Sequence, residues 1–152
     1  MEIGATKAVQ DRLKTTKIEE SKGASLVFCW DTHLTKIKGR NVLFIVNASN
    51  RYTIAMTDIE PRNWNYYTMY IRSVIHGVMQ EMGYSEDQIG QYFKMSGDTT
   101  VTKTHGRKSV GGINRMVMDA QYFGKKLEKE AKYQWELSEY LNRDICQPEG
   151  FD

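Results

Sequence analysis

The sequence predicts an α+β domain in which an antiparallel meander sheet carries three to four helices packed mainly on one face. Three observations predict this fold class. Strand-like alternation dominates residues 25–57, helical spacing of apolar residues dominates residues 64–123, and one strand-like segment, Thr99–Thr104, stands between helices. Strands that come mostly first and helices that follow are typical of an antiparallel sheet with helices on one side.

The expected strands follow one another through short turns. They are Ser25–Trp30, Thr32–Lys38, Asn41–Val46 and Arg51–Thr57. Asn41–Val46 is apolar and rich enough in β-branched residues for a central strand. Lys38–Arg40 and Asn47–Asn50 consist of residues that tolerate tight turns, so neighbouring strands are expected to pair in antiparallel fashion.

Helices are expected before and after the strands. The segment Gly4–Leu13 is interpreted as a short lead-in and helix. Later helices are expected over Trp64–Met82, over Glu86–Met95 behind a capping box of Ser85 and Gln88, and from Arg107 or Ser109 to Phe123. Residues 1–124 are therefore predicted to form one domain, and residues 125–152 a C-terminal helical extension and tail.

Composition narrows the possible functions. The 152 residues carry 21 basic and 19 acidic side chains, a net charge of +2, which argues against binding by bulk positive charge but allows a local basic patch. Cys29 and Cys146 are too few for a disulfide scaffold or a multi-cysteine zinc site; Cys29 is expected to be buried and Cys146 to be a free thiol. Neither a signal peptide nor a membrane span is indicated, so cytoplasmic residence is expected.

Short sequence segments resemble a known family. They are Ile3–Lys7, Phe28–Trp30, Val42–Asn47, Asn50–Tyr52 and Thr102–Thr104, with Arg107 and Asn114. In this order the chain resembles an uncharacterised family of small bacterial domains of unknown function, over about Ile3 to Phe123. The resemblance implies one compact α+β unit and supplies no reaction. In the family pattern a His directly follows the Trp and a Ser directly follows the Arg; Asp31 and Lys108 stand at those places here.

A basic turn between a strand and a helix is the first candidate site. Gly106 breaks the chain there, and a helix N-terminus presents unpaired N–H groups that attract phosphate or carboxylate. The candidate ligand-binding residues of this segment are Lys103, His105, Arg107, Lys108, Ser109 and Asn114. The alternative is a solvated turn in which Ser109 only caps the helix.

Arg51, Tyr52 and Trp30 are the second set of candidates. Arg51 and Tyr52 begin a strand at the sheet rim, where a guanidinium could bind a phosphate, and an exposed Trp30 could stack on a base. A plain hairpin turn and a core tryptophan are the alternatives. The three histidines lack metal-site spacing and no nucleophile motif occurs, so neither a metal, a cofactor nor a catalytic residue is expected.

These features favour a non-enzymatic domain that binds, and could sequester, a phosphate-bearing small molecule such as a nucleotide or a nucleotide-derived signal. An alternative is a protein-interaction or regulatory module that self-associates as a homo-oligomer, using the helical region Leu127–Leu141. A further alternative is nucleic-acid binding through Lys36, Lys38, Arg40 and the basic turn, against which the small net charge argues.

Overall fold

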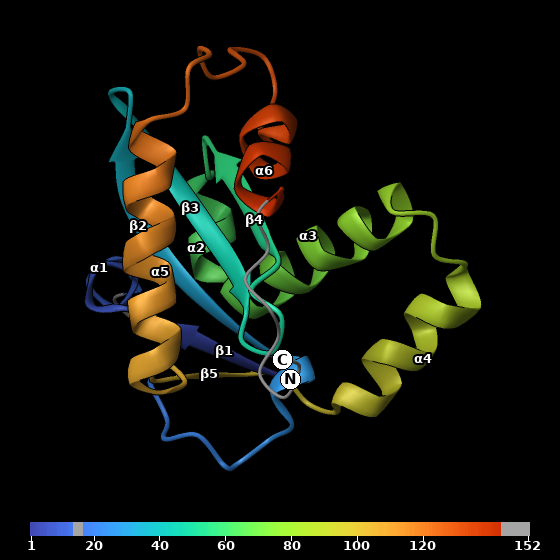
Figure 1. Cartoon of the computed structure of the whole chain (residues 1–152). Coiled ribbons are helices and arrows are strands. Elements are labelled where there is room, and N and C mark those ends of the chain that lie inside the picture. Colours follow the sequence, from blue (N-terminus) through green and yellow to red (C-terminus); the bar gives the residue numbers. More distant parts are fainter. Residues whose placement is uncertain (14–16, 144–152) are drawn as a thin grey trace.

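The computed structural model describes residues 1–13 and 17–143 (Figure 1). A five-stranded sheet has the strand order β4-β3-β2-β1-β5. The strands are β1 (Glu2–Ala5), β2 (Cys29–Ile37), β3 (Arg40–Asn47), β4 (Thr53–Thr57) and β5 (Thr100–Thr102). The helices are α1 (Lys7–Arg12), α2 (Pro61–Asn65), α3 (Tyr67–Glu81), α4 (Glu86–Ser96), α5 (Gly106–Gln121) and α6 (Trp135–Asn142), and a 3-10 turn, η1 (Leu26–Phe28), precedes β2.

The α+β class is confirmed, but the sheet is mixed. Strands β2, β3 and β4 form an antiparallel meander, with Trp30 opposite Asn47 and Val46 opposite Thr53. The expected strands Ser25–Trp30 and Thr32–Lys38 are not separate, because η1 takes up the start of the first one and β2 continues through Asp31, which pairs with Val46. The prediction of a purely antiparallel sheet is wrong because β1 pairs in parallel with both β2 and β5. All four residues of β1 are buried, so it shows no alternation, and Gly4 and Ala5 are poor strand formers.

Helices cover both faces of the sheet, so the prediction of helices mainly on one face is also wrong. On β3, Leu43 and Ile45 belong to a core shared with α1, α2 and α3, whereas Val42, Phe44 and Val46 belong to a core shared with α5 and α6. In Figure 1, α5 crosses in front of the sheet and α2 lies behind it. An uninterrupted apolar strand such as β3 is typical of a sheet covered on both sides.

The described residues form six α-helices, so the prediction of three to four helices is wrong, and the boundaries of the expected helices are shifted. The region expected as one helix from Trp64 to Met82 is divided between α2 and α3. The capping box is confirmed: the Ser85 hydroxyl accepts from the Gln88 N–H at 3.2 Å, and the Gln88 amide oxygen accepts from the Ser85 N–H at 2.9 Å. Helix α5 begins at Gly106, one residue before the earlier of the two expected starts.

The segment before α6, and α6 itself, lie along the outer strand β4. The Thr57 N–H donates to the Lys132 carbonyl at 2.7 Å, and the Gln134 N–H donates to the Ala55 carbonyl at 2.9 Å. The part of residues 125–152 that the structure describes therefore packs against the sheet, and its helix is confined to Trp135–Asn142.

Over residues 1–13 and 17–143, none of the helices has the length and apolar character required to cross a bilayer. Cys29 is buried with a free thiol, as expected. Cys146 lies outside the described residues.

Candidate functional site

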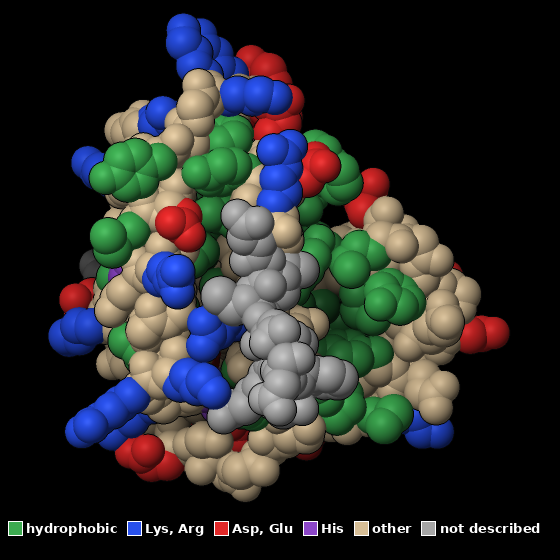
Figure 2. Space-filling model, viewed as in Figure 1, with side chains coloured by type: hydrophobic (Ala, Val, Ile, Leu, Met, Phe, Trp, Pro, Cys, Tyr) green, Lys and Arg blue, Asp and Glu red, His purple; other side chains and the backbone are tan. Residues whose placement is uncertain are grey.

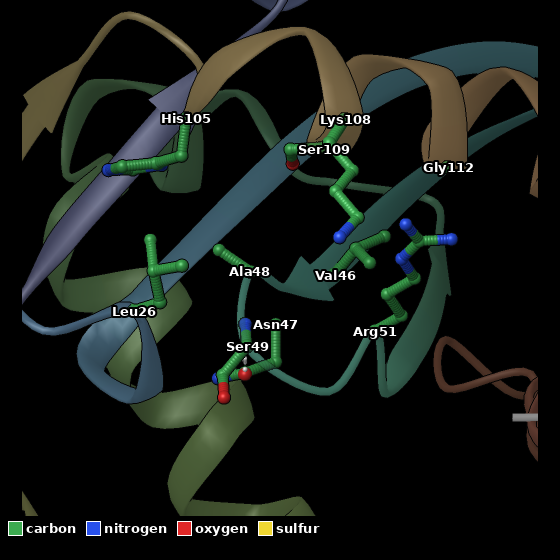
Figure 3. Close-up of a pocket in the computed structure, with 10 residues that line it drawn as sticks. All are labelled: Leu26, Val46, Asn47, Ala48, Ser49, Arg51, His105, Lys108, Ser109 and Gly112. Atoms are coloured by element: carbon green, nitrogen blue, oxygen red, sulfur yellow. Dashed lines mark hydrogen bonds between the residues drawn. The ribbon is translucent and has the colours of Figure 1, made fainter. Parts of the chain in front are cut away.

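A small cavity of about 50 Å³ lies where the first turn of α5 meets the turn between β3 and β4 (Figure 3). Its lining residues are Leu26, Val46, Asn47, Ala48, Ser49, Arg51, His105, Lys108, Ser109 and Gly112. We call it the anion cavity. The first N–H groups of an α-helix lack carbonyl partners within the helix, so the start of α5 supplies positive potential on one side.

Side-chain hydrogen bonds hold the β3–β4 turn in place. The Asn47 amide oxygen accepts from the N–H groups of Ser49 (2.9 Å) and Asn50 (3.2 Å), and its NH₂ donates to the Val27 carbonyl at 3.1 Å. Such Asx-type bonds mimic the backbone bonds of a turn. These hydrogen bonds therefore fix the backbone of the turn that precedes Arg51.

Arg51 is held in the left-handed backbone region, with φ of 64°. Its side chain lies against α5: a Cβ on Gly112 would stand 3.2 Å from the Arg51 Cζ. Within the described part of the chain, the guanidinium has neither a hydrogen bond nor an ion pair. Lys108 reaches the same cavity from α5, so two cationic side chains converge from different elements (Figure 3).

A larger groove of about 340 Å³ adjoins the anion cavity, and Asn47 lines both. We call it the apolar groove. It is lined by Val27, Trp30, Asn47, Asn50, Tyr52, Ile54, Ile75, Val78, Met79, Met82, Tyr84, Gln88 and Tyr92. Figure 2 shows hydrophobic side chains gathered on this α3–α4 side of the molecule. The Trp30 Nε1–H donates to the Tyr92 hydroxyl at 3.0 Å, which fixes both rings.

His105, one of the residues that line the anion cavity, has its side chain buried between two carboxylates. Its Nδ1 lies 2.6 Å from Asp31 Oδ1 and its Nε2 lies 2.8 Å from Glu2 Oε1. Burial by itself would lower the pKa of His105, but hydrogen bonds with Asp31, Cys29 and Glu2 outweigh it and raise the pKa to about 11. Both ring nitrogens therefore carry protons, and the imidazolium bridges the two acids.

The two carboxylates are held by further donors. Burial would raise the pKa of Glu2, but hydrogen bonds from the Ser21 hydroxyl, from His105 and from the Lys22 N–H lower it to about 2. The Asp31 carboxylate also accepts hydrogen bonds from the backbone N–H of His105 at 3.2 Å and from the Ser109 hydroxyl. Ser109 thus bonds Asp31, and the N-cap position of α5 belongs to His105, whose side chain makes no cap bond.

The structure brings some of the predicted site residues together and leaves others apart. His105, Lys108, Ser109 and Arg51 line the anion cavity, although the His105 ring points away from Lys108 and Arg51 (Figure 3). Trp30 and Tyr52 line the apolar groove, but Trp30 is only 7% exposed and belongs to the core, so the alternative of a core tryptophan is the one that the structure shows. Three predicted residues line neither: Lys103 forms an ion pair with Glu20 at 2.6 Å, and Arg107 and Asn114 are exposed on α5.

Sequence reasoning missed Glu2 and Asp31 as site residues. Glu2 and Asp31 lie 103 and 74 positions from His105, so no local spacing reveals them. The available signal was an acidic residue inside an apolar strand segment, since a buried carboxylate needs a charged or hydrogen-bonding partner. Asp31 also stands where the family pattern places His.

Fold and site together define a small α+β domain that has a cationic cavity, an adjoining aromatic groove and a buried ionic cluster. A family model described as a domain of unknown function, DUF6933, matches residues 2–152. The chain belongs to this family, which confirms the resemblance to a family of unknown function and extends it beyond Phe123. No curated protein and no solved structure matches the chain.

Proposed function

We propose that the protein binds a phosphate-bearing small molecule, with a nucleotide as the leading candidate, across the anion cavity and the apolar groove. The observation that carries this proposal is their junction: cationic Arg51 and aromatic Tyr52 are chain neighbours, and they line the cavity and the groove respectively. A nucleotide has a charged phosphate that suits the cavity and an aromatic base that suits the groove. Binding without chemistry, as in sequestration, suits this arrangement.

The sizes of the two spaces support this assignment. The anion cavity, at about 50 Å³, has room for one small charged group, whereas the apolar groove, at about 340 Å³, falls at the lower end of the range of ligand pockets. Arg51 can donate two parallel hydrogen bonds to a phosphate. The half-buried Tyr52 ring and the exposed Tyr84 ring offer stacking surface, whereas Trp30 is buried in the core. The side-chain NH₂ groups of Asn50 and Gln88, whose oxygens already accept backbone hydrogen bonds, can donate to the polar edge of a base.

Calorimetric titration with a panel of nucleoside monophosphates, the matching nucleosides and inorganic phosphate tests the proposal. At least one nucleotide is expected to bind more tightly than its nucleoside or phosphate alone. The decisive variant is Arg51→Gly, which removes the guanidinium and relieves the left-handed strain, so the fold is retained. Loss of a charge-assisted phosphate contact weakens binding roughly 10- to 100-fold.

Arg107→Ala is the matched control, because Arg107 is an exposed arginine of the same basic segment that lines neither space. It is expected to bind the nucleotide as the unchanged protein does. The proposal fails if the panel gives no binding, or if Arg51→Gly binds as tightly as the unchanged protein.

A protein-interaction module is the second candidate function, and the exposed apolar rim favours it. Val27, Met82 and Tyr84 are exposed large apolar residues along the groove. Contiguous exposed apolar surface is typical of partner sites. Homo-oligomerisation through such a surface is a prediction that the molecular mass in solution checks; a monomer across the accessible concentration range removes self-association.

Nucleic-acid binding and cytoplasmic location stay predictions. Arg40, one of the residues expected to contact nucleic acid, donates to the Glu128 carbonyl at 2.8 Å and pairs with Asp58 at 2.9 Å, which leaves it less available to phosphates. A steep loss of affinity with added salt is the expected mark of nucleic-acid binding. The cytoplasmic assignment rests on the sequence features given above.

A further inference from the structure

Three metal-binding donor atoms of different chemistry meet on the Nε2 side of His105. They are the Glu2 carboxylate oxygen, the Cys29 sulfur and the His105 ring nitrogen, and all lie within 4.8 Å of one another. The Nε2–Oε1 distance is 2.8 Å and the Sγ–Oε1 distance is 3.9 Å. A tetrahedral metal ion about 2.0–2.3 Å from each donor holds the donors about 3.3–3.6 Å apart, so Nε2 and Oε1 would separate by about half an ångström and Sγ and Oε1 would approach slightly.

The opposite side of the His105 ring has the arrangement that supports a metal-binding histidine. Its Nδ1 donates to Asp31 at 2.6 Å, and Asp31 is itself held by the His105 N–H and the Ser109 hydroxyl. Metal-bound histidines commonly donate their second N–H to a carboxylate, which fixes the ring and makes it a better ligand. Asp31 therefore orients Nε2 toward Glu2 and Cys29.

Space for Asp31 comes from Gly4 on the neighbouring strand β1. A Cβ on Gly4 would overlap the Asp31 carboxylate and would stand 3.1 Å from the Thr104 Cα, where backbone cannot give way cheaply. The parallel pairing of β1 and β2 places Gly4 directly opposite Asp31. The pairing of β1 with β2 and the absence of a Cβ on Gly4 therefore determine where the Asp31 carboxylate lies beside His105.

Cys29 is the member of the group that the ionic contacts do not require. Its side chain is fully buried, and its thiol lies 3.4 Å from the Ser25 carbonyl, 3.7 Å from the Ala24 carbonyl and 3.9 Å from the Glu2 carboxylate, and also interacts with His105. The imidazolium and the two carboxylates satisfy one another without it. A thiol beside a histidine and a glutamate adds the donor that a borderline-soft metal prefers.

We propose that Glu2, Cys29 and His105 form a binding site for a divalent metal ion of the zinc type, with Asp31 as the carboxylate that positions His105. Binding replaces two protons, one from His105 Nε2 and one from the Cys29 thiol, with one dication, so the net charge of the cluster does not change. Three protein ligands leave the fourth tetrahedral position to water or another ligand. His105 also lines the anion cavity, but its ring points away from Arg51 and Lys108 (Figure 3), so the metal proposal uses the Nε2 side of this ring and the nucleotide proposal uses Arg51.

The full chain, stripped with a chelator, is titrated with Zn²⁺ against a chromophoric competitor and then with Co²⁺. We expect one metal ion per chain, release of two protons measured from calorimetric heats in buffers of different ionisation enthalpy, and a sulfur-to-cobalt charge-transfer absorption. Cys29→Ser removes the thiolate but keeps the imidazolium and both carboxylates. Loss of an outer-shell partner alone weakens metal binding about 10- to 100-fold. This variant loses a direct ligand, so it should bind Zn²⁺ at least about 100-fold more weakly and lose the absorption.

Cys146→Ser is the matched control, since it removes the other thiol of the chain and should bind Zn²⁺ and Co²⁺ unchanged. Circular dichroism checks that each variant is folded; if Cys29→Ser does not fold, Cys29→Ala serves in its place, and the unchanged chain by itself still decides whether a site exists. Absence of Zn²⁺ binding by the unchanged chain overturns the proposal. Equal affinity in the Cys29 variant, or a thiolate absorption that depends on Cys146, also overturns it. Neither readout involves a phosphate ligand, so the outcome is independent of the nucleotide experiment.

Discussion

Arg51 and Gly112 show how two single residues shape the candidate site. Arg51 adopts a left-handed conformation that costs a non-glycine residue of the order of 1–3 kcal/mol, and the Asn47 and Asn50 side chains hold the turn that imposes it. Gly112 lacks the Cβ that would press on the guanidinium. The strained backbone of Arg51 and the absence of a Cβ on Gly112 thus act together to place the Arg51 guanidinium beside the start of α5.

Gly112→Ala and Gly111→Ala form a matched pair at the residue scale. Both lie inside α5, where exchanging Gly for Ala stabilises a helix by about 0.5–1 kcal/mol. A Cβ at position 111 meets nothing within 4 Å, whereas one at position 112 comes within 3.2–3.3 Å of the Arg51 guanidinium. We therefore expect Gly111→Ala to raise the free energy of unfolding without changing nucleotide affinity, and Gly112→Ala to weaken binding by displacing Arg51.

Urea denaturation and calorimetric titration of the two variants check this pair. Equal nucleotide affinity in both variants would mean that the position of Arg51 against α5 does not matter for binding.

At the element scale, both edges of the sheet are covered, β4 by α6 and the segment before it and β5 by the segment around Glu19. Along β4, the Ser138 hydroxyl and the Asn142 amide oxygen accept from the N–H groups of Ala55 (3.0 Å) and Thr53 (2.8 Å). Along β5, Glu19 exchanges backbone hydrogen bonds with Val101 and Lys103 at 3.0 Å each. Covered edges lack free backbone groups that could pair with another chain, so α6 and the segment around Glu19 protect the sheet from edge-to-edge association.

Ser138→Ala tests the covering of β4. The Ser138 hydroxyl is buried, accepts from the Ala55 N–H and donates to the Gln134 carbonyl at 2.7 Å. Its loss leaves the Ala55 N–H buried and unpaired, which costs about 1–3 kcal/mol. Chemical denaturation should show this loss of stability, while Ser73→Ala, which removes an exposed hydroxyl on α3, should change stability by about 0.5 kcal/mol at most. Equal stability of the two variants contradicts the assigned role of Ser138.

At the scale of the whole molecule, the buried ionic cluster joins distant parts of the chain. Glu2 comes from β1, Asp31 from β2, and His105 from the residue that precedes α5. The contact between Glu2 and His105 spans 103 positions and lies next to the parallel pairing of β1 with β5. Protonation of this cluster is therefore coupled to the global fold rather than to one element.

The pH dependence of stability follows from the pKa values of Glu2 and His105. The pKa of Glu2 is lowered from 4.5 to about 2, so its contribution is present above about pH 4.5 and is lost as the pH falls toward 2. The pKa of His105 is raised from 6.5 to about 11, so its contribution is present below about pH 6.5 and is lost as the pH rises toward 11. For chelator-treated protein, we expect these groups to favour stability most between about pH 4.5 and 6.5.

Urea midpoints measured at several pH values, with chelator present throughout, check this expectation. The midpoint should fall between about pH 6.5 and 9, because the unfolded chain releases the histidine proton there while the folded chain keeps it. A midpoint that does not change over this interval contradicts the bridging role of His105.

The elements that the sequence predicts correctly are those formed by neighbouring residues. The apolar run within Arg40–Asn47 indicates a central strand, and the Ser85–Gln88 pair indicates the start of α4, because propensity, alternation and capping act over a few residues. The same reasoning found the basic turn that contains His105 and Lys108, since a glycine break followed by a helix is a local signal. It also found Arg51 and Tyr52, which follow a turn rich in asparagine.

The features that the sequence does not reveal depend on distant segments meeting. Strand β1 has no alternating pattern of its own and exists because β2 and β5 pair with it on both sides. Arg107 was selected for its charge, but the direction of α5 leaves it exposed and brings Lys108 and Gly112 to the cavity instead. By itself, the sequence determined the α+β class and the basic turn, through short-range forces. Tertiary structure alone decided the mixed sheet, the two covered faces and the burial of His105 between Glu2 and Asp31, because long-range pairing and desolvation act only once the chain has folded.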